Sequence, residues 1–198
     1  MKTYVATKNA GKLAELRAIL AGSALELHAH PEYAGAIEDA NDYLGNALLK
    51  ARALARQLTA AGISAAVLAD DSGLEVDALG GRPGVYSARY AGAAATWTQR
   101  RAALLAELRG VPEAERGGRF VSAVALILPG GEELTARGSA GGRIAEEERG
   151  SEGFGYDPLF FYPPRGCTFA QLGAEEKNAV SHRRRAADAL LAALRERG

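Results

Sequence analysis

The short apolar segment at residues 65–69, AAVLA, constrains the fold more than any other feature of the sequence. Its apolar residues are continuous rather than alternating with polar ones, which is typical of a strand that helices cover on both faces of a sheet. Two acidic residues, Asp70 and Asp71, follow at once, and a Ser-Gly pair comes next. The sequence therefore predicts an α/β fold with the acidic pair at the carboxyl end of a buried strand.

Apolar spacing predicts further helices and strands on both sides of this strand. The most regular helical pattern covers residues 44–58, where leucine and alanine recur at three- and four-residue intervals. Other helices are predicted over 11–20, 98–109 and 178–197, and strands over 3–7, 25–29, 119–128 and 133–139, the last two joined by a turn at 129–131. This order of elements predicts one α/β unit bent around a groove, without a domain boundary.

Composition limits the classes of partner. The 24 basic residues balance the 24 acidic ones, so no overall field would hold the protein on a nucleic acid or an anionic membrane. Cys167 is the only cysteine, which excludes an internal disulfide and fits a reducing compartment. The N-terminus has no signal-like apolar region, and the longest apolar run, residues 124–128, is too short to span a bilayer. We therefore expect a cytoplasmic protein.

Asp70 and Asp71 need a partner, because two adjacent carboxylates after a buried strand repel each other. A metal ion, a proton or a lysine or arginine usually relieves such repulsion. Glu38 precedes the long predicted helix, and the three carboxylates together could hold Mg²⁺ with water completing its coordination. Acidic residues in turns also serve as solvated caps, so the spacing alone leaves both interpretations open.

A second candidate site is TKNAGK, residues 7–12, between the first predicted strand and helix. A helix N-terminus offers free N–H groups and a partial positive charge, so a hydroxyl, an amide and a lysine gathered there favour phosphate binding. The P-loop motif does not fit, because it needs a glycine where this chain has Ala6 and a Ser or Thr where it has Leu13.

Two later segments carry aromatic and basic residues suited to a nucleobase. GFGYDP, residues 153–158, mounts Phe154 between two glycines next to a carboxylate, which suits a stacking platform. In EEKNAVSHRRRA, residues 175–186, Lys177 precedes the predicted last helix while His182 and Arg183 lie on its first turns. Two structural alternatives stay open. Phe154 could instead be a core residue packed beneath a turn, and the run of three arginines, Arg183 to Arg185, could instead be a solvated helix face.

In this order the four motifs TKNAGK, DDSGLEVDALGGRPGVYSARYAG, GFGYDPLF and EEKNAVSHRRRA resemble the inosine triphosphate pyrophosphatase family, and the match spans nearly the whole chain. The resemblance implies a single domain over residues 1–198, an elongated two-lobed α/β fold with a mixed sheet and a central nucleotide-binding cleft. It also implies a homodimer and a requirement for Mg²⁺. The implied reaction cleaves noncanonical purine triphosphates (ITP, dITP, XTP) between the α and β phosphates.

The resemblance also implies roles for individual residues. Asp71 matches the general base and a metal ligand, and Glu38 matches the second metal ligand, although Asp39 or Asp42 could share its role because the family's Glu-Thr-Gly is absent here. Ser72, beside Asp71, matches a substrate contact. The other implied substrate contacts are Thr7, Asn9, Lys12 and Lys50 on the phosphate side and Phe154, Gly155, Tyr156, Asp157, Lys177, His182 and Arg183 on the base side.

The chemistry of the purine edge suggests how the base is chosen. Hypoxanthine and xanthine accept a hydrogen bond at O6 and donate one from N1, so Arg183 or a protonated His182 at O6 and Asp157 at N1 would favour them over adenine. No residue accounts for the exclusion of guanine. Two other functions stay open: a non-catalytic nucleotide- or RNA-binding module, and the septum-formation type of pyrophosphatase.

Overall fold

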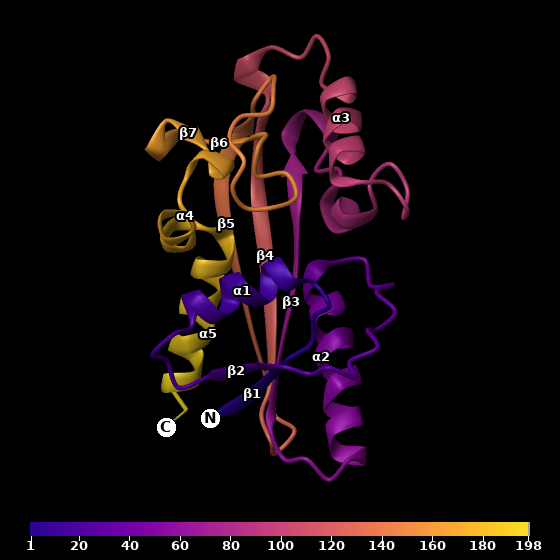
Figure 1. The fold of residues 1–198 in the computed structure, drawn as a ribbon, viewed down its shortest axis with the longest axis vertical. Helices are drawn as coiled ribbons and strands as arrows, with labels where there is room; N and C mark the ends of the chain where they lie inside the picture. The colour runs from indigo at the N-terminus through magenta and orange to yellow at the C-terminus, as the bar shows by residue number, and fades with distance from the viewer. Residues whose placement is uncertain (198) are drawn as a thin grey trace. The chain divides into compact units, whose positions relative to one another are not determined.

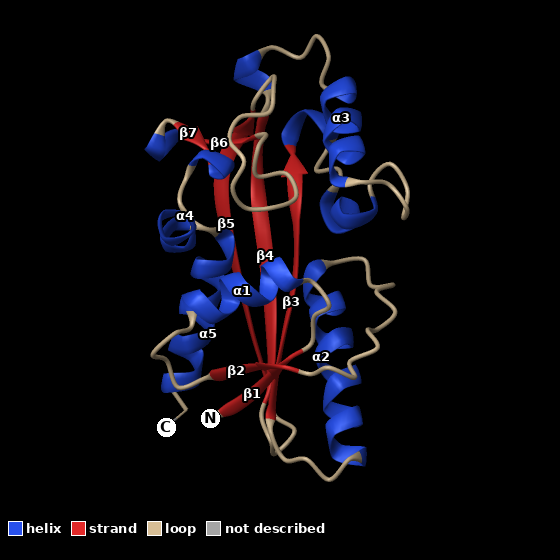
Figure 2. Cartoon of the chain, viewed as in Figure 1, coloured by secondary structure: helices blue, strands red, loops and turns tan. Residues whose placement is uncertain are grey.

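The computed structural model describes residues 1–197 (Figure 1). Strands, helices and connecting loops alternate along the chain (Figure 2). The strands are β1 (Lys2–Val5), β2 (Glu26–Ala29), β3 (Ala66–Val76), β4 (Gly117–Ile127), β5 (Glu133–Ile144), β6 (Phe160–Tyr162) and β7 (Cys167–Thr168). The α-helices are α1 (Ala10–Ile19), α2 (Tyr43–Ala60), α3 (Trp97–Glu107), α4 (Ala174–Val180) and α5 (His182–Arg195).

The strands form one mixed sheet in the order β2-β1-β3-β4-β5-β6-β7. β1 pairs in parallel with β2 and with the first part of β3, whereas β6 pairs antiparallel with both β5 and β7. The parallel strands β1, β2 and β3 are connected through the helices α1 and α2, whereas the antiparallel strands β6 and β7 are joined by the short segment 163–166. The predicted mixed α/β fold is confirmed.

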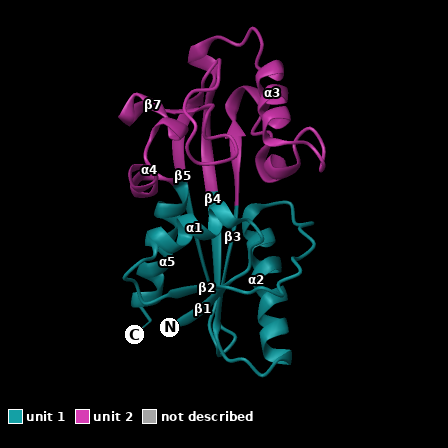
Figure 3. Cartoon of the chain, in the orientation of Figure 1, with its two compact units in different colours: residues 1–71, 122–138, 182–198 teal, residues 72–121, 139–181 magenta. Residues whose placement is uncertain are grey.

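The chain divides into two compact units (Figure 3). Unit 1 comprises Met1–Asp71, Ser122–Gly138 and His182–Gly198, and unit 2 comprises Ser72–Val121 and Ser139–Ser181. The strands β3, β4 and β5 each contribute residues to both units. Three of the four crossings between the units therefore lie inside strands, and the fourth lies between Ser181 and His182, at the junction of α4 and α5.

Unit 1 has helices on both faces of its part of the sheet. The apolar residues of α2, among them Ala47, Ala51 and Leu54, pack against Val67 and Ala69 of β3. On the other face, helices α1 and α5 pack against the alternate β3 residues, Ala66 and Leu68. Because successive side chains of a strand point to opposite faces, the continuous apolar run AAVLA serves both layers.

Unit 2 has its own core, which is rich in aromatic residues. Phe120, Phe160 and Phe169 pack together, with ring centroids 4.6 to 5.9 Å apart. Leu104 and Leu108, on α3 and directly after it, are fully buried in the same cluster. The short strands β6 and β7, which the sequence analysis did not predict, belong to this unit.

Several boundaries differ from the sequence-based expectation: β5, predicted to end at residue 139, extends to Ile144, and two further differences bear on the site. β3 does not end at Ala69 but continues through Asp70 and Asp71 to Val76, so the Ser-Gly pair is strand and not turn. The predicted last helix is two helices, α4 and α5, separated by Ser181, whose φ of −69° and ψ of 161° are extended. Helical spacing was wrong here because it does not reveal a single non-helical residue between two helical segments.

Candidate active site

Asp70 and Asp71 lie within β3 and point to opposite faces of the sheet. Asp70 follows the alternation of Ala66 and Leu68 toward α1 and α5, and Asp71 follows Val67 and Ala69 toward α2. Both residues are buried, at 2% and 6% exposure. Each carboxylate therefore has to find its compensating charge on its own side of the sheet.

Asp70 is the centre of a buried cluster of charges in unit 1. Its Oδ2 lies 2.9 Å from Nζ of Lys12 on α1 and 3.4 Å from Nε of Arg183 on α5. The hydroxyl of Ser122 on β4 donates to its Oδ1 at 2.5 Å. Arg183 also contacts Glu15 on α1, with Nη1 2.6 Å from Oε2. Lysine and arginine partners thus relieve the charge of Asp70, as the sequence analysis had left open.

This environment fixes the charges of the Asp70 cluster. Burial alone would raise the pKa of Asp70, but Lys12, Arg183 and the hydrogen bond from Ser122 hold that pKa well below its ordinary value of 3.8. Burial lowers the pKa of Lys12, although the charge of Asp70 opposes this effect. Asp70 is consequently ionised at every pH at which the protein is expected to work.

Asp71 belongs to a second cluster, with Lys50 of α2 at its centre. Nζ of Lys50 donates to Oδ1 of Asp71 at 2.7 Å and to Oε2 of Glu38 at 3.0 Å. The side chains of Lys50 and Asp71 are each 9% exposed, whereas that of Glu38 is 37% exposed. Two carboxylates from different segments of the chain therefore converge on one positive charge.

The charge balance of this second cluster suits acid–base chemistry. Burial raises the pKa of Asp71, which outweighs the opposing charge of Lys50. Burial disfavours the charged form of Lys50, yet Asp71 and Glu38 raise its pKa. A carboxylate with a raised pKa accepts a proton more readily than an ordinary one, which is the property required of a general base.

Asn46 connects Asp71 to the loop that carries Glu38. Its Nδ2 donates to Oδ2 of Asp71 at 3.3 Å, and its Oδ1 accepts from the backbone N–H of Ala40 at 3.1 Å. Asn46 precedes Lys50 by four residues, so both side chains lie on the same face of α2. Each end of the amide has a partner, and the Glu38 loop is thereby tied to β3.

The segment directly before α2, residues 38–42, contains three acidic residues, of which only Glu38 contacts Lys50 in the described contacts. Oδ1 of Asp42 accepts from the N–H of Gly45 at 2.6 Å and so forms the N-cap of α2. Asp39 is exposed. The geometry favours Glu38 over Asp39 and Asp42 as the partner of Asp71.

The expectation that Glu38, Asp70 and Asp71 form one three-carboxylate site is wrong. Asp70 faces the opposite side of the sheet, and within residues 1–197 no group of three or more His, Cys, Asp or Glu side chains is placed to hold a metal ion. Glu38 and Asp71 are two hard oxygen donors around one cation, which fits Mg²⁺ bound by one or two carboxylates together with substrate phosphates.

The segment TKNAGK forms the entry to α1, as predicted. Oδ1 of Asn9 accepts from the N–H of Lys12 at 3.1 Å and caps the helix, while Oγ1 of Thr7 accepts from the N–H of Asn9 at 3.1 Å. The side chain of Lys12 turns back to Asp70. The N-terminus of α1 and the side chain of Lys12 therefore supply positive potential near the carboxyl end of strand β1, at Val5.

The GFGYDP turn lies in unit 2 and is built around the buried carboxylate of Asp157. Its Oδ2 accepts from the backbone N–H of Phe154 at 2.8 Å and from Nζ of Lys177 at 2.5 Å. Nζ of Lys177 also lies 4.9 Å from the centre of the Phe154 ring. A side chain at Gly153 would collide with Asp157, because a Cβ there would lie 2.2 Å from Oδ2. The turn therefore presents a half-buried aromatic ring on a fixed backbone.

The remaining predicted residues are distributed over both units. Tyr156 is buried in unit 2, and its hydroxyl donates to the carbonyl of Ser87 at 3.2 Å. His182 and Arg183, the first two residues of α5, are buried in unit 1, at 2% and 3% exposure. Ser72 follows Asp71 in β3 and is half-buried. The contacts of Arg183 given above are with Asp70 and Glu15, so its approach to a purine stays a prediction.

Sequence reasoning missed Glu15, Asn46 and Ser122. Asn46 carried a usable signal, since it lies four residues before Lys50 on the same predicted helix. Ser122 is a lone hydroxyl in an apolar strand and gave no indication of its partner, which lies 52 positions earlier. Glu15 looked like any exposed helical glutamate until the fold placed Arg183 beside it.

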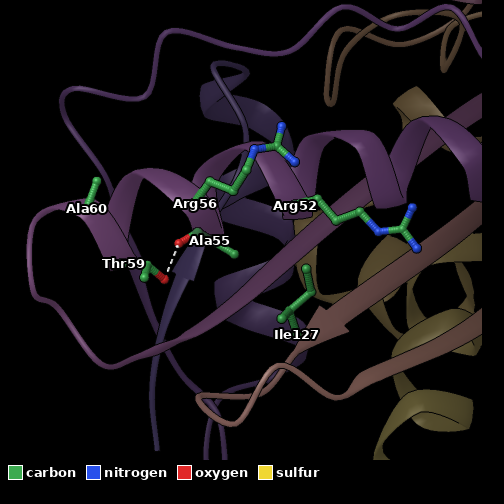
Figure 4. Close-up of a pocket in the computed structure, with 6 residues that line it drawn as sticks. All are labelled: Arg52, Ala55, Arg56, Thr59, Ala60 and Ile127. Atoms are coloured by element: carbon green, nitrogen blue, oxygen red, sulfur yellow. Dashed lines mark hydrogen bonds between the residues drawn. The ribbon is translucent and has the colours of Figure 1, made fainter.

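A shallow pocket elsewhere in unit 1 contains none of the predicted site residues (Figure 4). Arg52, one of its lining residues, pairs with Glu133, with Nε 2.7 Å from Oε1. The hydroxyl of Thr59 donates to the carbonyl of Ala55 at 3.0 Å. No acidic residue lines the pocket, so it is not suited to acid–base chemistry. Its lining residues are Arg52, Ala55, Arg56, Thr59, Ala60 and Ile127.

In residues 1–197, no helix has both the length and the apolar character needed to cross a bilayer.

Comparison with known proteins places the chain in a family. It is 50% identical over 188 residues to a dITP/XTP pyrophosphatase of Geobacter sulfurreducens, covering 93% of this chain and 92% of the relative. It is 47% identical over 188 residues to a dITP/XTP pyrophosphatase of Shouchella clausii, covering 94% of this chain and 92% of the relative. The solved Staphylococcus aureus Ham1 protein has a TM-score of 0.84 at 35% identity, with all of both chains covered. The Ham1 family model matches residues 3–193, and the chain belongs to the Ham1 family.

Proposed function

We propose that this protein hydrolyses the noncanonical purine nucleoside triphosphates ITP, dITP and XTP to the nucleoside monophosphate and pyrophosphate, and thereby cleanses the nucleotide pool. The relatives named dITP/XTP pyrophosphatase support this activity. The observation that carries the proposal is the cluster in which Lys50 joins Glu38 to Asp71, because it combines a buried base with a metal-binding pair of carboxylates.

The proposed role of Asp71 is to orient and deprotonate the attacking water. Its raised pKa brings it closer to the working pH, and Asn46 and Lys50 fix its two oxygens. Positioning and electrostatic stabilisation are the main sources of rate in phosphoryl transfer, so no covalent nucleophile is needed. Ser72, next to Asp71, is assigned to a substrate contact.

The triphosphate is assigned to unit 1. Lys12 and Lys50 supply positive charge, and the capped N-terminus of α1, with Thr7 and Asn9, offers N–H groups to phosphate oxygens. Cleavage between the α and β phosphates then leaves a pyrophosphate whose developing charge is already balanced.

A divalent cation, Mg²⁺, is proposed as the cofactor, held by Glu38 and Asp71. When bound, it supplies charge neutralisation and polarisation of the phosphate oxygens. Lys50 lies between the two carboxylates in this structure, and its flexible side chain is proposed to turn toward a phosphate group when the metal ion is bound.

The purine is assigned to the turn of unit 2 and to the start of α5. Phe154 is the stacking surface, with Gly155, Tyr156, Asp157 and Lys177 holding it in place. His182 and Arg183 are proposed to read the O6 edge. Because adenine has an amino group at this position, Arg183→Ala is expected to raise KM for ITP more than KM for ATP.

Several broader assignments belong to the same proposal. Residues 1–198 act as one pyrophosphatase domain made of both units, and two copies form a homodimer. The protein works in the cytoplasm, on free nucleotides and not on nucleic acid or membranes, because the nucleotide pool is there. The resemblance of the motifs supports the dimer, and light scattering of the purified protein tests it.

One assay tests the activity and the bond that breaks. Purified protein is incubated with Mg²⁺ and each of ITP, dITP, XTP, GTP, ATP and a pyrimidine triphosphate in ¹⁸O-labelled water. We expect pyrophosphate from the first three substrates, with the label in the corresponding nucleoside monophosphate, which is IMP when the substrate is ITP. IDP as a product, or label in pyrophosphate, would contradict the mechanism. A preference for the pyrimidine triphosphate would favour the septum-formation type, and binding without turnover would indicate a non-catalytic module.

A further inference from the structure

The base-binding turn is held from one side by α3, a helix that has no assigned function. Nη1 of Arg101 donates to the backbone carbonyl of Gly155 at 2.9 Å. Its Nε lies 2.9 Å from Oε1 of Glu148, and its side chain is only 13% exposed. Arg101 is thus a largely buried cation. Glu148 balances its charge, and its guanidinium group reaches the Gly155 carbonyl in the middle of the GFGYDP turn.

Trp97, four residues earlier on α3, contacts the same turn. A Cβ on Gly155 would lie 3.7 Å from the nearest Trp97 ring atoms, so the indole lies directly against that backbone. The Trp97 ring also meets Tyr156 edge-on, with centroids 5.5 Å apart. Residues four apart share one face of a helix, and this face of α3 therefore forms the support of the turn.

The turn needs such support because its backbone is intrinsically permissive. Gly153 and Gly155 both have positive φ, at 73° and 69°, and glycine also populates other conformations readily. Asp157 holds both sides of Phe154, because its carboxylate accepts from the N–H of Phe154 and its own N–H donates to the Phe154 carbonyl at 3.3 Å. The hydrogen bond from Arg101 to the Gly155 carbonyl fixes the following peptide unit, Gly155–Tyr156, and so holds the backbone directly after Phe154.

We propose that Arg101 is a positioning residue for purine recognition, which acts by fixing the Gly155 peptide so that Phe154 can stack on the base. This inference rests on the proposed function, because the proposed function assigns the purine to Phe154. Arg101 acts through the turn and does not need to touch the substrate. Its loss should therefore weaken the binding of molecules that contain a purine and should not affect the binding of phosphate groups alone.

The test compares the affinity of IMP with that of pyrophosphate, by calorimetry, in the wild-type protein and in Arg101→Met. We expect the Kd for IMP to rise about tenfold, the scale of one hydrogen bond to a charged group, while the Kd for pyrophosphate stays within about twofold. The matched control is Arg109→Met, an exposed arginine two residues beyond the end of α3, which should change neither value.

A second variant keeps the test decisive if Arg101→Met does not fold. Arg101→Lys retains a donor for the Gly155 carbonyl and should raise the Kd for IMP above the wild-type value, but by less than about tenfold, again without changing pyrophosphate binding. Equal weakening of both ligands, or wild-type affinity for IMP in both variants, would overturn the inference. Failure of the proposed function is distinguishable, because the wild-type protein itself would then release no pyrophosphate from ITP.

Discussion

At the scale of single residues, the two adjacent aspartates illustrate how strand geometry separates chemical roles. Asp70 faces Lys12 and Arg183, and Asp71 faces Lys50 and Asn46, on opposite sides of one strand. The pKa of Asp70 is lowered and that of Asp71 is raised. One aspartate is thereby suited to anchoring positive charges and the other to accepting a proton, so their substitution should have different consequences.

Asp71→Asn should abolish turnover and leave the fold intact. The amide has nearly the same shape but is not a base, and general-base catalysis is worth about 10²–10⁴-fold. The measurement is the steady-state rate of pyrophosphate release from ITP, together with the urea midpoint of unfolding. More than about a tenth of the wild-type rate would contradict the role of Asp71.

Asp70→Asn should instead destabilise the protein. It leaves Lys12 buried without its ion-pair partner and leaves Arg183 with Glu15 alone, and breaking a buried ion pair costs about 3–5 kcal/mol. The free energy of unfolding from urea titration at neutral pH measures this loss, with Asp71→Asn as the matched control.

The same variant gives a pH dependence with a defined sign. The pKa of Asp70 in the folded protein lies below its ordinary value of 3.8, so the stability it contributes is present above that value. This stability is lost as the pH falls from there toward the folded pKa. The difference in unfolding free energy between wild type and Asp70→Asn should therefore narrow below about pH 4. A difference that stays constant into acid would show that ionised Asp70 is not its source.

At the scale of secondary-structure elements, the start of α5 is placed by its close contact with β5. A Cβ at Gly138 of β5 would lie 2.2 Å from the backbone nitrogen of Ala186 and 2.5 Å from the carbonyl of His182. Both contacts are with backbone atoms, which cannot turn away as the end of a flexible side chain can. Glycine at this position therefore allows the first turn of α5, with His182 and Arg183, to lie directly on the strand.

Gly138→Ala should consequently cost about 1–3 kcal/mol of unfolding free energy, the usual penalty of overpacking. Because the displaced segment carries His182 and Arg183, KM for ITP should rise as well. Gly141→Ala, in the same strand but with no atom within 4 Å of the added Cβ, is the control and should match wild type in both measurements. Equal behaviour of the two alanine variants would show that the strand–helix contact can relax.

At the scale of the whole molecule, the two compact units share the strands β3, β4 and β5. Unfolding one unit would remove ordered residues from each of these strands and leave the other unit with frayed ends. This continuity predicts one cooperative unfolding transition in place of two.

The single tryptophan, Trp97, makes this prediction testable. Trp97 lies in unit 2, so its fluorescence reports that unit, whereas far-UV circular dichroism reports helices of both units. Urea unfolding should give coincident midpoints by the two methods. Separate midpoints would mean that the units unfold independently in spite of their shared strands.

The sequence by itself determined the local elements and the chemistry that they carry. The apolar spacing of residues 44–58 predicted α2, the continuous apolar run predicted the buried start of β3, and the motifs located Glu38, Lys12, Asp71 and the Phe154 turn. These features depend on neighbours within a few positions, which is the range over which periodicity and capping operate.

Only the tertiary structure decided where β3 ends and which partner each aspartate has. The partners of Asp70 include Ser122 and Arg183, which lie 52 and 113 positions away in the chain. Two adjacent acidic residues in a buried strand are unfavourable, because burial and mutual repulsion disfavour their charges. Positive charges from distant segments of the chain compensate for this and allow the strand to continue. The same reason hid the role of Arg101, because its hydrogen bond to Gly155 spans 54 positions. Contacts of this length exist only after the chain has folded, so no local pattern can encode their geometry.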